Sequence, residues 1–140
     1  MDLVRNPDVG SLVVGRAVAV PRLLTQEDFY RFARLSGDDN PIHVDPDFCA
    51  GTRWGRTLAH GMLLYSLIIQ TIRTELLPGA IELEQDLMFP GPTFADEVVI
   101  VHAEVVKVDR ARNEVEVRAR VTRPDGGIGC EGRTLVRTHV

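Results

Sequence analysis

The sequence predicts an α+β fold in which an antiparallel β-sheet wraps around one long buried helix. Apolar and polar residues alternate in the C-terminal half, most cleanly over residues 115–121, as in strands with one covered face. Residues 59–76 form a helix-length segment that is apolar on nearly all sides in its first turns, as in a buried helix. This helix is the only candidate large enough for the sheet to cover.

The length, charge and composition of the chain are typical of a globular protein with one domain, and we expect a single domain over residues 1–140. The formal net charge of −4 and the scattered arginines argue against nucleic-acid binding. The longest apolar run, residues 62–69, is far short of the ~20 residues of a membrane span, and the N-terminus lacks a signal peptide's apolar core. Cys49 and Cys130 lack metal-ligand spacing and are expected to be reduced, so we expect a cytoplasmic protein.

In chain order, residues 1–10 are expected to be a loose lead-in, and residues 13–20 a first strand with Pro21 near its end. Thr25 can cap a helix with an acidic first turn, which Gly37 would end. Two prolines within residues 38–47 predict a tight loop with about one helical turn. A small helix over 47–51 and an irregular segment over 52–57 are expected next.

The second half predicts the central helix and then the sheet. The helix over 59–76 should end at the Pro78-Gly79 pair. Alternating apolar residues predict strands near 81–89, 99–105, 115–121 and 128–140, separated by turn-rich segments. Because the alternation is one-sided, the sheet should be antiparallel with one face on the helix.

Two polar features stand out against this scaffold. Asp38 and His43 place a carboxylate and an imidazole five residues apart in the turn-rich loop, and Gly61 lies at the start of the central helix. Such a pair can transfer protons, and a helix N-terminus can donate a backbone N–H to a polarised carbonyl. The two segments together predict a site for chemistry on a carbonyl compound.

These segments resemble the MaoC-like family, the (R)-specific or type 2 enoyl-CoA hydratases. The resemblance rests on Ser-Gly-Asp-Asp-Asn-Pro-Ile-His-Val-Asp at residues 36–45, on Ala-His-Gly-Met-Leu at residues 59–63, and on the preceding Phe32. Residues 89–96 are similar to the family's connection between two strands. The resemblance implies a hotdog fold, here a single hotdog, in a homodimer or larger homo-oligomer whose sheets join edge to edge.

The resemblance also implies roles for particular residues. Asp38 and His43 would hold one water against the β-carbon of a trans-2-enoyl thioester, leaving open which is base and which acid. Gly61 would donate its backbone N–H to the thioester carbonyl. Asn40 would support the loop, or it could serve only as a turn former. The product would be an (R)-3-hydroxyacyl thioester, and no metal or redox cofactor is implied, since coenzyme A enters with the substrate.

Four further residues are candidates for substrate binding. His60 and Met62 lie at the start of the central helix, where His60 could equally serve in packing. Trp54 and Leu58 could line an acyl pocket or merely cover the core.

Other functions remain open from the sequence. The same residues would serve a 3-hydroxyacyl dehydratase that acts on acyl carrier protein thioesters. A non-catalytic acyl-thioester-binding hotdog partner is the third possibility, but such a protein has no need of an intact Asp38/His43 pair. A thioesterase is disfavoured, because the central helix offers no carboxylate before Glu75.

Overall fold

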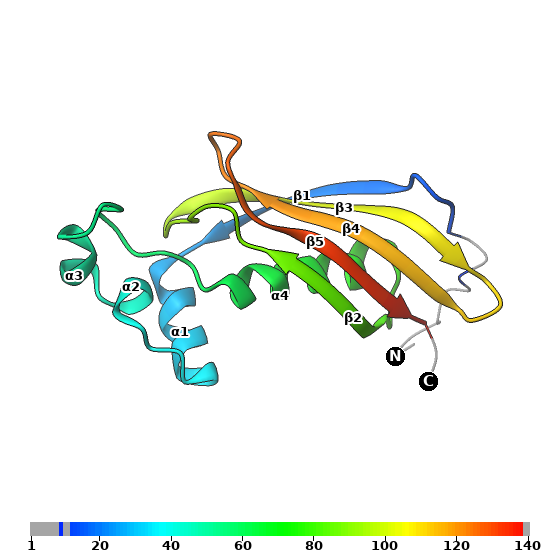
Figure 1. Cartoon of the computed structure of the whole chain (residues 1–140), viewed down its shortest axis with the longest axis horizontal. Coiled ribbons are helices and arrows are strands. Elements are labelled where there is room, and N and C mark those ends of the chain that lie inside the picture. Colours follow the sequence, from blue (N-terminus) through cyan, green and yellow to red (C-terminus); the bar gives the residue numbers. More distant parts are fainter. Residues whose placement is uncertain (1–8, 10–11, 139–140) are drawn as a thin grey trace.

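The computed structural model describes Val9 and residues 12–138, and its helices and strands follow the predicted order (Figure 1). The lead-in predicted for residues 1–10 lies outside the described residues, apart from Val9, which is buried. The elements are β1 (Ala17–Leu24), α1 (Gln26–Ser36), α2 (Pro41–Val44), α3 (Pro46–Ala50), α4 (Gly61–Thr71), the π-helical segment η2 (Ile72–Leu76), β2 (Ile81–Met88), β3 (Glu97–Asp109), β4 (Glu114–Thr122) and β5 (Ile128–Arg137).

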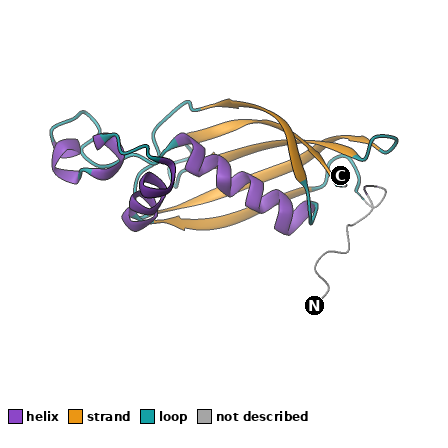
Figure 2. Ribbon diagram, turned by 90° about the horizontal axis from the view of Figure 1, so that it is seen from below, coloured by secondary structure: helices purple, strands orange, loops and turns teal. Residues whose placement is uncertain are grey.

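The five strands form one antiparallel sheet with the order β1-β3-β4-β5-β2. Figure 2 shows α4 lying across one face of this sheet. The sheet curves around the helix, which confirms the α+β class predicted from the one-sided alternation.

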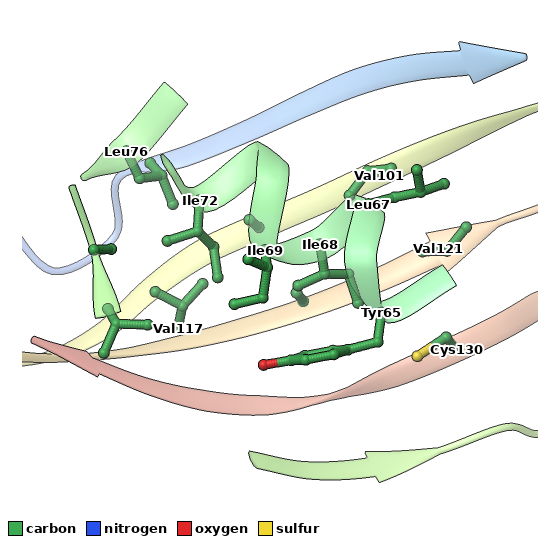
Figure 3. Close-up of a cluster of buried hydrophobic side chains, with 14 of the residues drawn as sticks. Tyr65, Leu67, Ile68, Ile69, Ile72, Leu76, Val101, Val117, Val121 and Cys130 are labelled. Carbon is green, nitrogen blue, oxygen red and sulfur yellow. The ribbon is translucent and has the colours of Figure 1, made fainter. Parts of the chain in front are cut away.

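The core is the layer between α4 and the sheet (Figure 3). Valines that alternate along β3 and β4, such as Val101, Val117 and Val121, are buried on the helix side. Ile68 and Ile72 meet them from the helix and are equally buried. Burying apolar surface is the main favourable term in folding, so this layer fixes the position of α4 and of its first turn.

The first helix begins and ends as its sequence predicts. Thr25 and Asp28 form a capping box, in which each side chain accepts a hydrogen bond from the other residue's backbone N–H. Gly37 ends α1 with φ 78°, a left-handed conformation that glycine adopts without a steric penalty. The chain therefore turns sharply just before Asp38.

Several element boundaries differ from the predictions, those of the first strand and the central helix among them. The first strand spans Ala17–Leu24, with Pro21 in its interior, because β1 lies at the sheet edge, where a missing donor is tolerated. The central helix begins at Gly61, two residues later than expected, and its last turns continue as η2.

The covered face predicted for residues 81–89 is largely wrong. Ile81, Leu83 and Phe89 are all exposed by more than a third of their surface, and of the alternating apolar residues Leu87 alone packs against the core. The alternation correctly predicted a strand, but β2 is an edge strand that pairs only with β5. Within the described part of the chain, the apolar side chains Ile81, Leu83 and Met88 on this strand are left exposed.

Cys49 and Cys130 are both buried and unpaired, as expected. Among the described residues, no helix has the length and apolar character that crossing a membrane would require. The buried apolar residues of α4 belong instead to the core.

We expect Ile68→Ala to lower the free energy of unfolding by about 2–5 kcal/mol, because Ile68 is only 1% exposed and its loss leaves a cavity. Leu35→Ala is the control, since Leu35 lies on α1 and is 87% exposed. That change should stay within about 0.5 kcal/mol. Urea unfolding of both variants measures the difference, and equal losses would contradict the core assignment.

Candidate active site

The two predicted segments meet at the N-terminal end of α4. Helices α1, α2 and α3 gather at that end of the molecule, away from the described C-terminal end of β5 (Figure 1). Leu58 donates its backbone N–H to Ile42 at 2.8 Å, and Ala59 donates to Thr93 at 2.7 Å. The loop that holds Asp38 and His43 is thus joined to the chain leading into the central helix.

His43 is held by the one-turn helix α2. Asn40 caps this helix by accepting a hydrogen bond from the Ile42 N–H at 3.2 Å, and Pro41 occupies the first helical position, where no donor is needed. The His43 Nδ1 lies 2.7 Å from the Leu58 carbonyl. Because a carbonyl oxygen only accepts, Nδ1 carries a proton, and in the neutral form of the ring the lone pair is on Nε2.

Asp38 lies opposite that lone pair. Its Oδ2 is 3.8 Å from His43 Nε2, and its side chain is exposed while His43 is nearly buried. The backbone N–H of Asp38 donates to Ser36 Oγ at 3.1 Å. The separation is too long for a direct hydrogen bond but short enough for one water to contact both atoms.

His60 lies against both members of the pair. Its ring stacks on that of His43 with centroids 3.9 Å apart, and its Nε2 is 2.9 Å from the backbone carbonyl of Asp38. Phe32 covers another side of the ring at 4.7 Å. Burial lowers the pKa of His60.

Sequence reasoning missed Gln26, which lies in the first turn of α1. Its Nε2 donates to the His43 carbonyl at 3.0 Å, and its Oε1 accepts a hydrogen bond from Thr57. Gln26 therefore ties α1, α2 and the segment before α4 together. Nothing in the local sequence distinguishes this glutamine from a solvated one, because its partners are 17 and 31 residues away.

The first turn of α4 is open to a ligand. His60 occupies the N-cap position but makes no side-chain cap hydrogen bond. The first N–H groups of a helix have no intrahelical acceptor, so they remain available to an anionic oxygen. Gly61 leaves room here, because a methyl group in its place would lie 2.6 Å from the Phe89 ring.

A cavity of about 520 Å³ lies beside this turn. Among the predicted residues, it brings together Asp38, Gly61, His60 and Met62, while His43 lies next to the first and third of these. Most of the remaining wall is apolar or small. The full lining is Phe32, Ser36, Asp38, Ala59, His60, Gly61, Met62, Leu64, Phe89 and Gly129.

Two predicted substrate contacts do not line this cavity. Trp54 is half-buried and lies under the Arg53 guanidinium, 4.2 Å from its ring centroid. Leu58 serves through its backbone, by accepting the hydrogen bond from His43. Phe89 is one of the apolar lining residues that sequence reasoning missed; its signal was an apolar residue at the end of a strand, directly before Pro90.

A larger hollow of about 820 Å³ lies elsewhere, along the sheet. It is bordered by strand residues such as His102, Arg118 and Glu131, and by none of the predicted site residues. It also lacks a helix N-terminus. We therefore place the candidate site in the smaller cavity, where proton-transfer groups and backbone donors meet.

Ligand atoms of Asp38, His43 and His60 lie within 4.8 Å of one another, which is close enough to consider a metal ion. However, His43 Nδ1 and His60 Nε2 are each engaged by a backbone carbonyl. The two rings are also stacked, with 26° between their planes. His43 Nε2 and His60 Nδ1 are thus the ring nitrogens that no backbone carbonyl engages, which leaves at most one ligand atom from each ring for an ion.

The chain is similar to known proteins in sequence and in structure. Residues 13–125 match the family model described as MaoC like domain. The (R)-specific enoyl-CoA hydratase of Aeromonas caviae is 32% identical over 128 residues, covering 91% of this chain and 96% of that protein. The 3-hydroxybutyryl-CoA dehydratase of Methylorubrum extorquens is 31% identical over 127 residues, covering 90% of this chain and 80% of that protein.

A solved structure extends the likeness to three dimensions. The (R)-hydratase from A. caviae involved in PHA biosynthesis matches with a TM-score of 0.87 and 32% identity, over 91% of this chain and 97% of that one. The likeness therefore extends over most of the chain. By sequence and by fold, this chain belongs to the family of MaoC-like domain proteins.

Proposed function

We propose that this protein hydrates trans-2-enoyl-CoA to (R)-3-hydroxyacyl-CoA, or catalyses the reverse dehydration. The observation that carries the proposal is the close approach of Asp38 and His43 beside the uncapped first turn of α4. The names of the relatives in Aeromonas caviae and Methylorubrum extorquens support the same reaction.

In this proposal one water lies between Asp38 Oδ2 and His43 Nε2. Its oxygen bonds to the β-carbon of the enoyl group while the pair takes up one proton. The electrons of the double bond move toward the thioester oxygen, and the α-carbon then receives a proton from the pair. The sum of these steps is the addition of one water molecule across the double bond, and Asp38 and His43 return to their starting protonation states.

The developing negative charge needs a fixed donor. We assign this role to the backbone N–H of Gly61, because the helix N-terminus is uncapped and its dipole favours an anion. Loss of a single donor of this kind typically slows a reaction by about 10²–10³-fold. Asn40 supports the arrangement indirectly, through its cap on α2.

The protein's own groups suffice for this reaction, so we propose that it uses no metal or redox cofactor. Coenzyme A would enter only as part of the substrate. We also propose a cytoplasmic location, where the thiols of Cys49 and Cys130 stay reduced.

We further propose that two copies join along β2. This strand is a sheet edge whose apolar side chains Ile81, Leu83 and Met88 are exposed. Edge strands offer unpaired backbone groups to a second chain, and exposed apolar residues add to the gain on pairing. The opposite edge, β1, is less suited because Pro21 lacks a backbone donor.

We expect the wild-type protein to remove the conjugated enoyl absorbance of crotonyl-CoA, and Asp38→Asn and His43→Gln each to lower kcat by at least about 10²-fold. Both substitutions keep the size of the side chain but remove a proton-transfer group. Thermal melting checks that the fold is intact. Cys49→Ser, next to the loop, is the control and should keep nearly full activity.

Near-full activity in either site variant would refute the assignment of the pair. No turnover by the wild-type enzyme would favour two other functions. Turnover of an enoyl thioester on acyl carrier protein would indicate the carrier-protein dehydratase. No turnover of either substrate would indicate a binding partner.

We expect the wild-type chain to elute with twice its mass of 15.5 kDa in size exclusion with light scattering. Leu83→Lys should shift it toward monomer, because Leu83 is 40% exposed on β2 and a charge there opposes apolar contact. Leu35→Lys, on exposed α1, should leave the mass unchanged. A dimer that tolerates Leu83→Lys would argue against pairing along β2.

A further inference from the structure

We infer that His60 is a positioning residue that holds both members of the proton-transfer pair in place. It donates from Nε2 to the Asp38 carbonyl at 2.9 Å, and its ring stacks on His43 at 3.9 Å. It is the one described residue whose side chain makes both of these contacts. The inference rests on the proposed function and assigns His60 a role other than the expected substrate contact.

His60 and His43 each donate a hydrogen bond to the backbone segment that carries the other histidine. His43, on the first segment, donates to the carbonyl of Leu58 on the second at 2.7 Å. His60, on the second segment, donates to the carbonyl of Asp38 on the first. Each imidazole thus holds the backbone segment that carries the other imidazole. The stacking of the two rings adds a third contact between the segments.

Hydrogen bonding assigns the protonation state of His60. Since the Asp38 carbonyl only accepts, Nε2 carries the proton. Nδ1 is buried and has no partner among the described residues. A second proton on Nδ1 would have no acceptor and would place a cation against the His43 ring, so His60 stays neutral and does not itself carry the proton in the reaction.

The position of Asp38 depends on the hydrogen bond from His60, because few other contacts restrain this residue. It lies between α1 and α2, outside both helices, and its side chain is exposed. Its backbone N–H donates to Ser36 Oγ, and its carbonyl accepts from His60. Without the His60 donor, the carboxylate could move relative to His43, and a displacement of about 1 Å can cost roughly 10²-fold in rate.

The neutral state of His60 predicts a pH dependence of stability. Burial lowers its pKa in the folded protein, while the ionisable groups that face it, Asp38 and His43, act in opposite directions. In the unfolded chain the pKa is about 6.5. The unfolded state therefore binds the extra proton first, and the stabilisation that is complete above about pH 6.5 declines as the pH falls below it.

The urea midpoint of the wild type should thus fall between pH 7.5 and pH 5.5, and fall less in His60→Phe. The pKa of His102 is also lowered by burial, but that residue contributes equally to both proteins. An identical pH dependence in the two proteins would contradict a neutral, buried His60.

Two substitutions separate positioning from packing. His60→Phe keeps a ring to stack on His43 but removes the donor to Asp38. His60→Gln can keep the donor but loses the stacking. We expect His60→Phe to lower kcat by roughly 10–100-fold with KM within about twofold, and His60→Gln to recover at least part of that loss.

Hydrogen exchange of the peptide covering residues 36–44 supplies a readout that needs no turnover. This peptide should exchange faster in His60→Phe than in wild type. Leu77→Ala is the matched control, because it creates a buried cavity just after η2, at the far end of the central helix from the first turn of α4. It should lower the melting temperature while leaving kcat and the exchange of this peptide unchanged.

A kcat within twofold of wild type in His60→Phe, or unchanged exchange in that peptide, would overturn the inference. A rise in KM alone would overturn it too, in favour of direct substrate contact. If the wild-type protein hydrated no enoyl-CoA, the proposed function would fail, yet the exchange experiment would still decide whether His60 holds the loop.

Discussion

The site depends on two crossed hydrogen bonds between segments that are about 20 residues apart in the chain. His43 donates to Leu58, and His60 donates to Asp38. Backbone carbonyls can only accept, so the same two bonds that join the segments also fix the tautomer of each ring. A structural constraint therefore determines which nitrogen of His43 faces Asp38.

The rest of the fold keeps these segments at one place. The buried layer between α4 and the sheet fixes the helix axis, and hence the position of its first turn. The Thr93 carbonyl, in the connection between β2 and β3, accepts from Ala59 and anchors the chain just before that turn. Gln26 ties the start of α1 to His43 from the other side. Rigid elements thus surround a short irregular loop, an arrangement suited to accurate positioning of reactive groups.

Local sequence signals predicted the parts of this arrangement that depend on neighbouring residues. The capping box at Thr25, the stop at Gly37 and the apolar periodicity of α4 all concern residues within a few positions of one another. The pairing of Asp38 with His43 was also predictable, because both lie on one short loop. The resemblance to a known family added the expectation that Gly61 lies beside them.

Long-range relations were not predictable in the same way. The alternation in β2 predicted a strand but could not say that it lies at the sheet edge, because edge position follows from the order of all five strands. The contacts of Gln26 and Phe89 at the site were not predicted, because the residues that they contact are distant in sequence. Trp54 looked suited to an acyl pocket by residue type, yet its position depends on how the segment after α3 folds back.

The N-cap residue of α4 is His60, which is not among the residue types usually preferred at this position, and this choice has a physical reason. Ser, Thr, Asn or Asp at the N-cap would satisfy a backbone donor and stabilise the helix by about 1 kcal/mol. His60 occupies that position but directs its side chain to Asp38 instead. This placement leaves the first N–H groups of α4 without a side-chain cap, and in the proposed function these groups receive the substrate oxygen while His60 holds Asp38. Sequence preferences such as those at the N-cap are most often broken at functional sites. In the proposed reaction, His60 at this N-cap lies between the backbone N–H that would bind the thioester oxygen and the Asp38/His43 pair that would transfer the protons.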